Sequence, residues 1–329
     1  MVAVTHYDKD HVGGLCHILL QPQRDSVRCY DQGWPEAGDA MNDWYTRYVR
    51  AVSGYQRDGA RRAPALKNVD LSQRRRPTNR VRAGNLAPTM PAAAYHAPAI
   101  DGNPINQAAR WLVLQEILWN PNPVPAGAPS IICIAANTHV AEHGGTVSAG
   151  IGGNGADPRN EKSLAFLVTF NNFRYYVGGD LETQQEDELC DYLNHADNAN
   201  GRVQAMKASH HGAHTSSSQD FIDCLRPEAV FISCGTDNQY DHPHQAVTDR
   251  LDAGNISHYL TGESEEVDYL GNNSYIAGGD DDNDGHIVLK VSAAQSNRPP
   301  TSANPAGIFS VSYYDGNTDA MENITHTGV

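Results

Sequence analysis

The sequence has no apolar run long enough to span a membrane, and no charged-then-apolar signal segment follows Met1. We therefore expect a cytoplasmic protein with no membrane span in this chain. Basic residues are few, because 24 Lys and Arg stand against 39 Asp and Glu, a formal net charge of −15. This balance argues against non-specific attachment to nucleic acid or membranes, so a polyanionic substrate would need a local basic patch or a bound metal.

The six cysteines form no CxxC pair, so the sequence suggests neither a zinc ribbon nor a dense disulfide scaffold. We expect reduced, mostly buried thiols. Hydrophobic residues make up 40% of the chain, a little low but enough for a substantial core in 329 residues.

The start of the chain carries the most informative pattern. An apolar run at residues 2–4 indicates the end of a buried strand, and four possible metal ligands follow it, His6, Asp8, Asp10 and His11. Alternate positions such as His6 and Asp8 can face the same side, with Asp10 and His11 on the turn beyond. Imidazole and carboxylate suit zinc, manganese or iron, and a hydrolytic pair of metals needs such closely spaced donors. The alternative is a polar turn that happens to carry two histidines.

Periodicity and turn residues predict an alternation of strands and helices in the second half of the chain. Asn171 and Asn172 predict a tight hairpin between two of the strands. We expect strands at 130–136, 164–170, 173–177, 202–208, 229–233 and 286–291, helices at 39–55, 184–195, 218–225 and 245–252, and a helix or strand at 108–119.

We expect one domain at residues 1–292, with an Arg- and Pro-rich insertion at 57–104 and an acidic insertion at 262–285. A tail at 293–329 should contain one edge strand, at 308–313. Residues 57–82 hold nine Arg or Lys against two Asp. They could clamp a phosphate backbone or form a solvated surface loop.

A carboxylate follows the second strand of the hairpin, in the sequence Gly178-Gly179-Asp180. The glycines allow close approach of the backbone. One carboxylate can bridge two cations about 3.5–4 Å apart. Asp180 could equally be the N-cap of the next helix, and the two roles can coexist through different oxygens.

Two histidine pairs follow later strands. In Ser209-His210-His211-Gly212, adjacent side chains leave the strand on opposite sides, so we expect only one imidazole to face the metals and the other to face the substrate or support a ligand. His242 and His244, beyond strand 229–233, could orient a leaving group or contact phosphate.

Together these motifs resemble the metallo-β-lactamase superfamily. Residues 5–14 (THYDKDHVGG) are similar to its signature metal loop, and residues 179–180, 209–212 and 242–244 follow in the family's order. The resemblance is closest to the hydrolase domain of ComEC-like competence proteins, in which HxDxDH replaces HxHxDH. It covers roughly residues 1–20 and 130–292, and it implies an α/β (α+β) fold, a four-layer αββα sandwich with a binuclear metal site along one edge of the sheets.

The resemblance also implies a ligand set. His6 and Asp8 would bind one metal, and Asp10, His11 and one of His210 and His211 the other. Asp180 would bridge them. We prefer His211, because related loops use the residue just before the glycine. The oxygen-rich set suits zinc first and admits manganese.

The sequence departs from the family pattern in two places. The further ligand histidine that superfamily members usually have is missing from residues 160–163, as in ComEC-like relatives, and His139 and His143 are possible substitutes. The fold normally begins tens of residues before the metal loop. We therefore expect the first strands to be missing, through a misassigned start, a partner chain that supplies them, or decay of the gene.

These features favour a hydrolase that uses metal-activated water on a small-molecule or nucleic-acid phosphodiester. Asp10 or Asp180 would orient the water, and His210, His242 or His244 would protonate or polarise the leaving oxygen. The alternatives are hydrolysis of a thioester, lactone or β-lactam, or a non-catalytic binding domain or remnant.

Overall fold

The computed structural model describes residues 2–19, 29–30, 44, 47–48, 113–114, 127–148, 159–194, 202–235, 238–262, 271, 273–279, 283–293, 309–315, 318 and 320–326. The expected insertion at 57–104, with its Arg-rich segment, lies outside these residues. Most of the expected helix at 39–55 and of the apolar segment at 108–119 does too. None of the helices in the described part of the chain is both long and apolar enough to cross a membrane.

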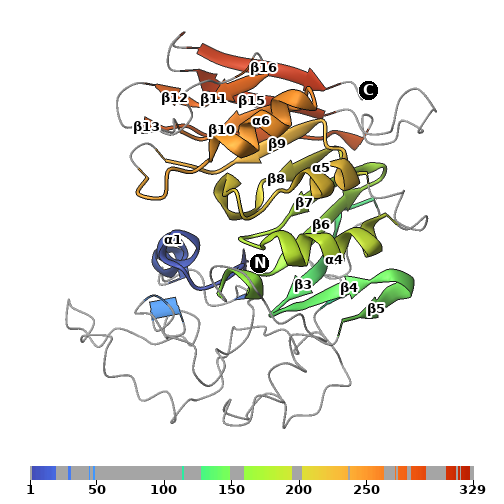
Figure 1. Cartoon of the computed structure of the whole chain (residues 1–329). Helices are drawn as coiled ribbons and strands as arrows, with labels where there is room; N and C mark the ends of the chain where they lie inside the picture. Colours follow the sequence, from blue (N-terminus) through green and yellow to red (C-terminus); the bar gives the residue numbers. More distant parts are fainter. Residues whose placement is uncertain are drawn as a thin grey trace, which may run out of the picture.

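A mixed nine-stranded sheet forms the centre of the fold (Figure 1). Its parallel half contains five strands and its antiparallel half four. In spatial order the strands are β11 (Ser274–Ile276), β10 (Ser257–Leu260), β9 (Ala229–Ile232), β8 (Ala205–Lys207), β7 (Phe173–Val177), β6 (Ala165–Phe170), β3 (Ser130–Ala136), β4 (His139–Glu142) and β5 (Thr146–Val147).

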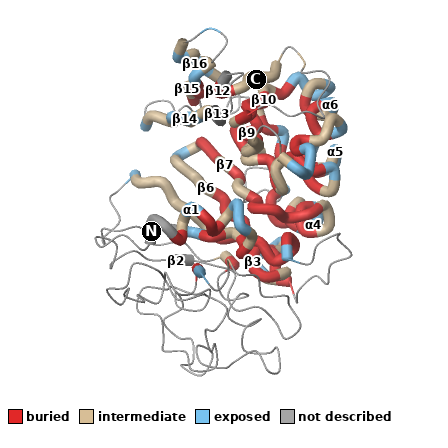
Figure 2. The backbone as a smooth tube through the Cα atoms, turned by 90° about the vertical axis from the view of Figure 1, so that its left-hand side faces the viewer, coloured by how far each residue is buried: buried red, intermediate tan, exposed pale blue. Residues whose placement is uncertain are grey.

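Three helices connect the successive parallel strands β7 to β10. They are α4 (Thr183–Leu193), α5 (Gln219–Leu225) and α6 (Gln245–Ala253), and they cover one face of the sheet (Figure 1). Helix α5 begins where the Ser218 hydroxyl accepts a hydrogen bond from the Phe221 backbone N–H, a standard N-cap. The buried faces of these helices and the strands beneath them form the main hydrophobic core (Figure 2).

A second sheet packs on the opposite face of the first. Its strands are β12 (Gly278–Gly279), β13 (Asn283–Asp284), β14 (Ile287–Lys290), β15 (Phe309–Asp315) and β16 (Ala320–His326). Burial alternates along β15, so its inward side chains Phe309 and Tyr313 meet Phe173 and Tyr259 of the first sheet at ring distances of 5.5 and 6.0 Å.

The described residues thus form three layers, helices on a large sheet on a smaller sheet, in a mixed α/β fold. They contain no helix that covers the outer face of the second sheet, where Val288 and Met321 are exposed. The fourth layer of the expected αββα sandwich is therefore not found among them.

The predicted hairpin is confirmed: β6 and β7 pair antiparallel around Asn171, which adopts the left-handed conformation (φ 53°) that tight turns require. The helices expected at 184–195, 218–225 and 245–252 are also confirmed within two residues. A 3-10 turn at His143–Gly145 lies between β4 and β5.

The second half contains strands that the sequence did not predict. Within the expected insertion at 262–285, β11 extends the large sheet beside β10 and two further short strands join the second sheet. The expectation of an edge strand near the C-terminus is wrong. Residues 309–315 are not an edge strand, because β15 pairs with β14 on one side and β16 on the other. In both cases the strands are stabilised by partners distant in the chain.

The N-terminal segment forms a short parallel pair, β1 (Val2–Ala3) with β2 (Cys29–Tyr30), followed by helix α1 (Lys9–Leu19). Asp10 and His11 therefore lie in the first turn of a helix, where we expected a turn. An acidic residue such as Asp10 is favourable there because it faces the positive end of the helix dipole. The backbone N–H of Leu164 donates to the Thr5 carbonyl (2.9 Å) and joins this segment to the start of β6.

Candidate metal centre

The carboxyl ends of three neighbouring parallel strands meet beside the N-terminal segment. Asp180 follows β7, the turn Ser209–Gly212 follows β8, and Ser233 follows β9. In open α/β sheets this edge is where ligands bind, because the strand ends and the turns after them converge there.

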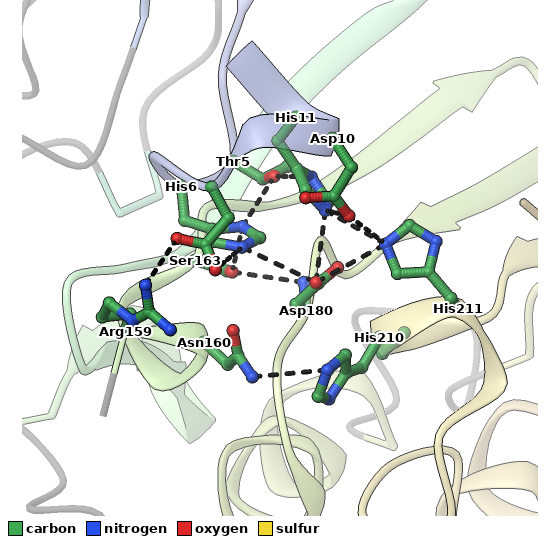
Figure 3. Close-up of polar contacts among 12 residues, drawn as sticks. Thr5, His6, Asp10, His11, Arg159, Asn160, Ser163, Asp180, His210 and His211 are labelled. Carbon is green, nitrogen blue, oxygen red and sulfur yellow. Dashed lines mark hydrogen bonds and ion pairs between the residues drawn. The ribbon is translucent and has the colours of Figure 1, made fainter. Parts of the chain in front are cut away.

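Asp180 lies at the centre of the cluster and is buried. Its Oδ2 is 3.2 Å from Nε2 of His11 and 3.6 Å from Nε2 of both His6 and His211 (Figure 3). Its backbone N–H donates to the Ser163 hydroxyl (3.2 Å), which fixes the turn after β7. One carboxylate thus faces three imidazoles from two distant parts of the chain.

Asp10 and the two nearest imidazoles complete a compact group. Asp10 Oδ2 is 3.1 Å from His211 Nε2 and 3.4 Å from His11 Nε2, and the two Nε2 atoms are 3.1 Å apart. One ligand atom from each of Asp10, His11, Asp180 and His211 lies within 4.8 Å of the others. Two imidazoles and two carboxylates at this separation suit zinc or manganese.

The outer nitrogen of each ring is oriented by a neighbour. His211 Nδ1 is 2.6 Å from the Ser233 carbonyl oxygen, which can only accept, so Nδ1 carries the hydrogen. In the neutral ring, Nε2 then has a free lone pair directed at Asp180. His11 Nδ1 lies 2.9 Å from the Thr5 hydroxyl, which can donate or accept, so this contact fixes the orientation of the ring. Such partners fix the ring orientation of metal-binding histidines.

Two further atoms support a cation at this place. Among the described residues, His6 Nε2 and Asp180 Oδ1 are buried without a hydrogen-bond partner. Buried polar atoms are rarely left in this state, because each loses its hydration without compensation. A divalent cation would satisfy both, so the donor set fits the metal that the sequence predicts.

Asp8 lies on the His6 side of the cluster. Its Oδ2 is 3.9 Å from His6 Nε2, and its Oδ1 is 3.1 Å from the Arg159 guanidinium. The structure therefore places Asp8 near the expected first metal position, with an arginine as a second partner. That arginine was not among the residues singled out from the sequence.

Burial and neighbouring charges shift the pKa values of the cluster residues in different directions. Burial lowers the pKa of His6 to about 3. Burial also acts to lower the pKa of His11, but Asp10 and Asp180 outweigh it and raise the value to about 9. For both carboxyl groups burial acts against ionisation, yet His11 and His211 hold their pKa values well below the usual range. The carboxylates are thus ionised and ready to bind a cation.

His210 and His211 diverge, as adjacent side chains were expected to. The turn Ser209–Gly212 holds both residues at positive φ, 46° and 57°. His211 points at Asp180, whereas the His210 Nε2 lies 3.4 Å from the Asn160 amide nitrogen (Figure 3). Burial lowers the pKa of His210. His210 is therefore neutral and stands beside the ligand cluster, outside it.

His242 and His244 occupy different positions. The His242 ring stacks on His211 (6.1 Å between centroids, 9° between planes) and contacts His210 at 5.2 Å. Burial first, and then the neighbouring histidines, lower the pKa of His242 to about 3. His244 lies behind it, where its Nδ1 accepts a hydrogen bond from the His214 backbone N–H (2.9 Å).

The possible substitute ligands lie elsewhere. His139 is buried on β4 with its Nδ1 3.0 Å from the Ser148 carbonyl, and His143 belongs to the exposed turn between β4 and β5. The ligand group found among the described residues contains neither of them.

An open pocket of about 920 Å³ borders the cluster. Asp8, Asp10, His211 and His242 line it, as do residues that we did not single out from the sequence: Lys9, Trp44, Arg159 and Tyr240. Lys207, at the end of β8, was also not singled out from the sequence. Its amine donates to the Ala208 carbonyl (3.1 Å), and burial lowers its pKa. Its position three residues before His210 was the one available sequence signal for it.

A scan against protein families found none that matches the chain. Parts of the chain are similar to ComE operon protein 3 of Bacillus subtilis (strain 168), 30% identical over 111 residues, and to competence protein ComA of Neisseria gonorrhoeae, 35% over 97 residues. Recombination protein 2 of Haemophilus influenzae is 29% identical over 92 residues. These stretches cover 34%, 30% and 28% of this chain but only 14%, 14% and 11% of those proteins.

Among solved structures, a protein from Parabacteroides distasonis described as a metal-dependent hydrolase matches with 12% identity and a TM-score of 0.26. The match covers 45% of this chain and 55% of that one, and the score is too low to support an argument. The expected similarity to competence proteins is thus confirmed for about a third of the chain. Membership of the metallo-β-lactamase superfamily stays a prediction.

Proposed function

We propose that this chain is a metal-dependent hydrolase of the metallo-β-lactamase type, and that it cleaves phosphodiesters. The observation that carries the proposal is the convergence of three imidazoles on Asp180, with two further carboxylates beside them. The similarity to competence proteins supports the same branch of hydrolases.

The donor set divides into two sites that share Asp180. His6 and Asp8 would hold one cation with Asp180, and Asp10, His11 and His211 would hold the other. Zinc is the first candidate and manganese the second, because the set mixes imidazole with several carboxylates. When bound, such a metal pair lowers the pKa of water and neutralises charge on the reacting phosphate.

The side chains beside the ligands have distinct tasks. Asp10 has 59% of its side chain exposed and lines the pocket, so it can orient a water as well as bind metal. His210 and His242 have lowered pKa values and are neutral near pH 7. They therefore polarise a leaving oxygen through an N–H hydrogen bond and do not deliver a full proton. His244 packs edge-on against the His242 ring, with 5.0 Å between the ring centroids.

The pocket suits an anionic substrate despite the acidic ligands. Lys9 and Arg159 line the same cavity as Asp8 and Asp10, and the bound cations add positive charge. Arginine binds phosphate oxygens well because its planar group presents several donors. A phosphodiester is thus favoured over a neutral lactone or thioester, which carries no negative charge for Lys9 or Arg159 to bind.

The test combines metal content with activity. Elemental analysis of the purified protein should find zinc or manganese, and bis(p-nitrophenyl) phosphate and single-stranded DNA should be cleaved. Asp10→Ala should lose most of both activities, whereas Asp223→Asn, an exposed acid on α5, should retain them. A metal-free protein that cleaves neither substrate, or one that cleaves lactone or thioester far better, would contradict the proposal.

A further inference from the structure

Three rings form a column from the metal centre to the solvent. His211 stacks on His242 (9° between planes), and His242 stacks on Tyr240 at 5.9 Å and 24°. Tyr240 is 64% exposed, the most exposed of the large hydrophobic side chains in the described part of the chain. The outermost ring of the column thus has a face available to a ligand.

Hydrogen bonds close the turn at residues 238–241, which carries Tyr240. The Asn238 side chain donates to the Gly235 carbonyl (2.9 Å) and the His242 carbonyl (2.8 Å), and it accepts from the His242 N–H (2.8 Å). The Asp241 N–H also donates to the Asn238 carbonyl (3.0 Å). A ligand that stacks on Tyr240 therefore does not have to order this turn first, which favours binding.

The other large aromatic side chain in the pocket is placed differently. The Arg47 guanidinium lies 4.5 Å from the centroid of the Trp44 ring and covers one of its faces. Among the described residues, the ring contact of Tyr240 is with His242, and 64% of its surface is exposed. Among the pocket aromatics that the structure describes, Tyr240 is the one best placed to stack with a planar ligand.

We propose that Tyr240 is a specificity-determining residue, which stacks a nucleobase of a single-stranded nucleic acid next to the scissile phosphodiester. A base on Tyr240 lies two ring contacts from His211, while Lys9 and Arg159 face the same cavity and can contact the backbone. Aromatic side chains hold single strands in this way because every base has a π face. The inference rests on the proposed function in taking this cavity as the substrate pocket.

Binding without hydrolysis tests the inference. The probe is fluorescein-labelled hexathymidylate with uncharged methylphosphonate linkages, titrated with the full chain in EDTA and followed by fluorescence anisotropy. The matched probe has the same backbone with abasic sites. Wild type should bind the base-bearing probe more tightly, and Tyr240→Ala should weaken that binding about 5- to 100-fold. Tyr240→Phe, which keeps the ring, should bind like wild type.

Two results would overturn the inference. In the first, the wild type binds the base-bearing and the abasic probe with equal affinity. In the second, Tyr240→Ala weakens binding of the abasic probe as much as binding of the base-bearing probe. Because no bond is cleaved, the outcome is separate from that of the proposed function. Base-dependent binding by a protein that cleaves no diester would contradict only the proposed function, and diester cleavage without such binding would contradict only this inference.

Discussion

The Nε2 atom of His11 lies 3.1 Å from the Nε2 atom of His211, although 200 residues separate the two histidines in the chain. Two imidazole nitrogens face each other across the position where Asp10 and Asp180 also converge. Two imidazole nitrogens this close together are stabilised when both lone pairs bind the same cation. This arrangement leads to two predictions about the metal ligands.

Asp180→Ala should remove the group shared by both proposed cations. We expect metal affinity and hydrolysis to fall by more than about 100-fold, because even partners outside the ligand shell commonly contribute 10- to 100-fold. Isothermal titration with zinc and elemental analysis measure the change. The exposed Asp187→Asn on α4 is the control, and an Asp180→Ala protein that still holds two metals would contradict the ligand assignment.

The adjacent histidines should behave differently. His211→Ala should lose metal, because His211 Nε2 points at Asp180. His210→Ala should retain metal yet lower kcat roughly 10- to 100-fold, since the neutral ring only polarises the leaving group. Metal content and kcat of the two variants, measured side by side, decide the assignment. If His210→Ala loses the metal and His211→Ala keeps it, the two roles must be exchanged.

Glu186 should make stability depend on pH. Burial raises the pKa of this carboxyl on α4 to about 8, from an ordinary value of 4.5, so the folded protein holds a proton that the unfolded chain releases. The stabilisation is full below about pH 4.5 and is lost as the pH rises through 8. Its slope approaches roughly 1 kcal/mol per pH unit.

Glu186→Gln should therefore flatten this slope, while the glutamine oxygen still accepts from the Ser217 N–H (2.7 Å). Urea unfolding at pH 5.5 and 7.5 measures the free energy of unfolding of both proteins. The exposed Glu188→Gln on the same helix should leave the slope as in wild type. An unchanged slope in Glu186→Gln would show that this carboxyl is ionised in the folded protein.

Gly179→Ala should destabilise the protein by about 2–4 kcal/mol. Gly179 has φ +59°, and a Cβ there would lie 2.7 Å from the Thr5 Cβ and 3.0 Å from the Ser163 Cβ. The substitution thus combines backbone strain with overpacking. Gly144→Ala, at φ +75° with open space around it, should show only the backbone part, about 1 kcal/mol. Equal losses in urea unfolding would rule out the close approach to Thr5.

The sequence predicted those parts of the fold that depend on interactions between neighbouring residues. The hairpin followed from Asn171 and Asn172, because a tight turn depends on a few adjacent residues. Strand β11 could not be predicted in this way. It has three residues, none of them buried, and its pairing with β10 is decided by the sheet that surrounds it.

The residues of the candidate site could be predicted from the sequence, but the arrangement of their side chains could not. The spacing of His6, Asp8, Asp10 and His11 indicated a metal, but the helix that carries the last two was not foreseen. The preference for His211 rested on the family resemblance alone. The Ser233 carbonyl, which orients its ring, lies just after β9 and carries no signal in the sequence.

The cluster also joins parts of the chain that are distant in the sequence. A cation held by His11 and His211 would close a loop of 200 residues, and cross-links across long loops remove the most conformational entropy from the unfolded chain. Because the ligands are together only in the folded protein, free metal concentration would set its melting temperature by mass action.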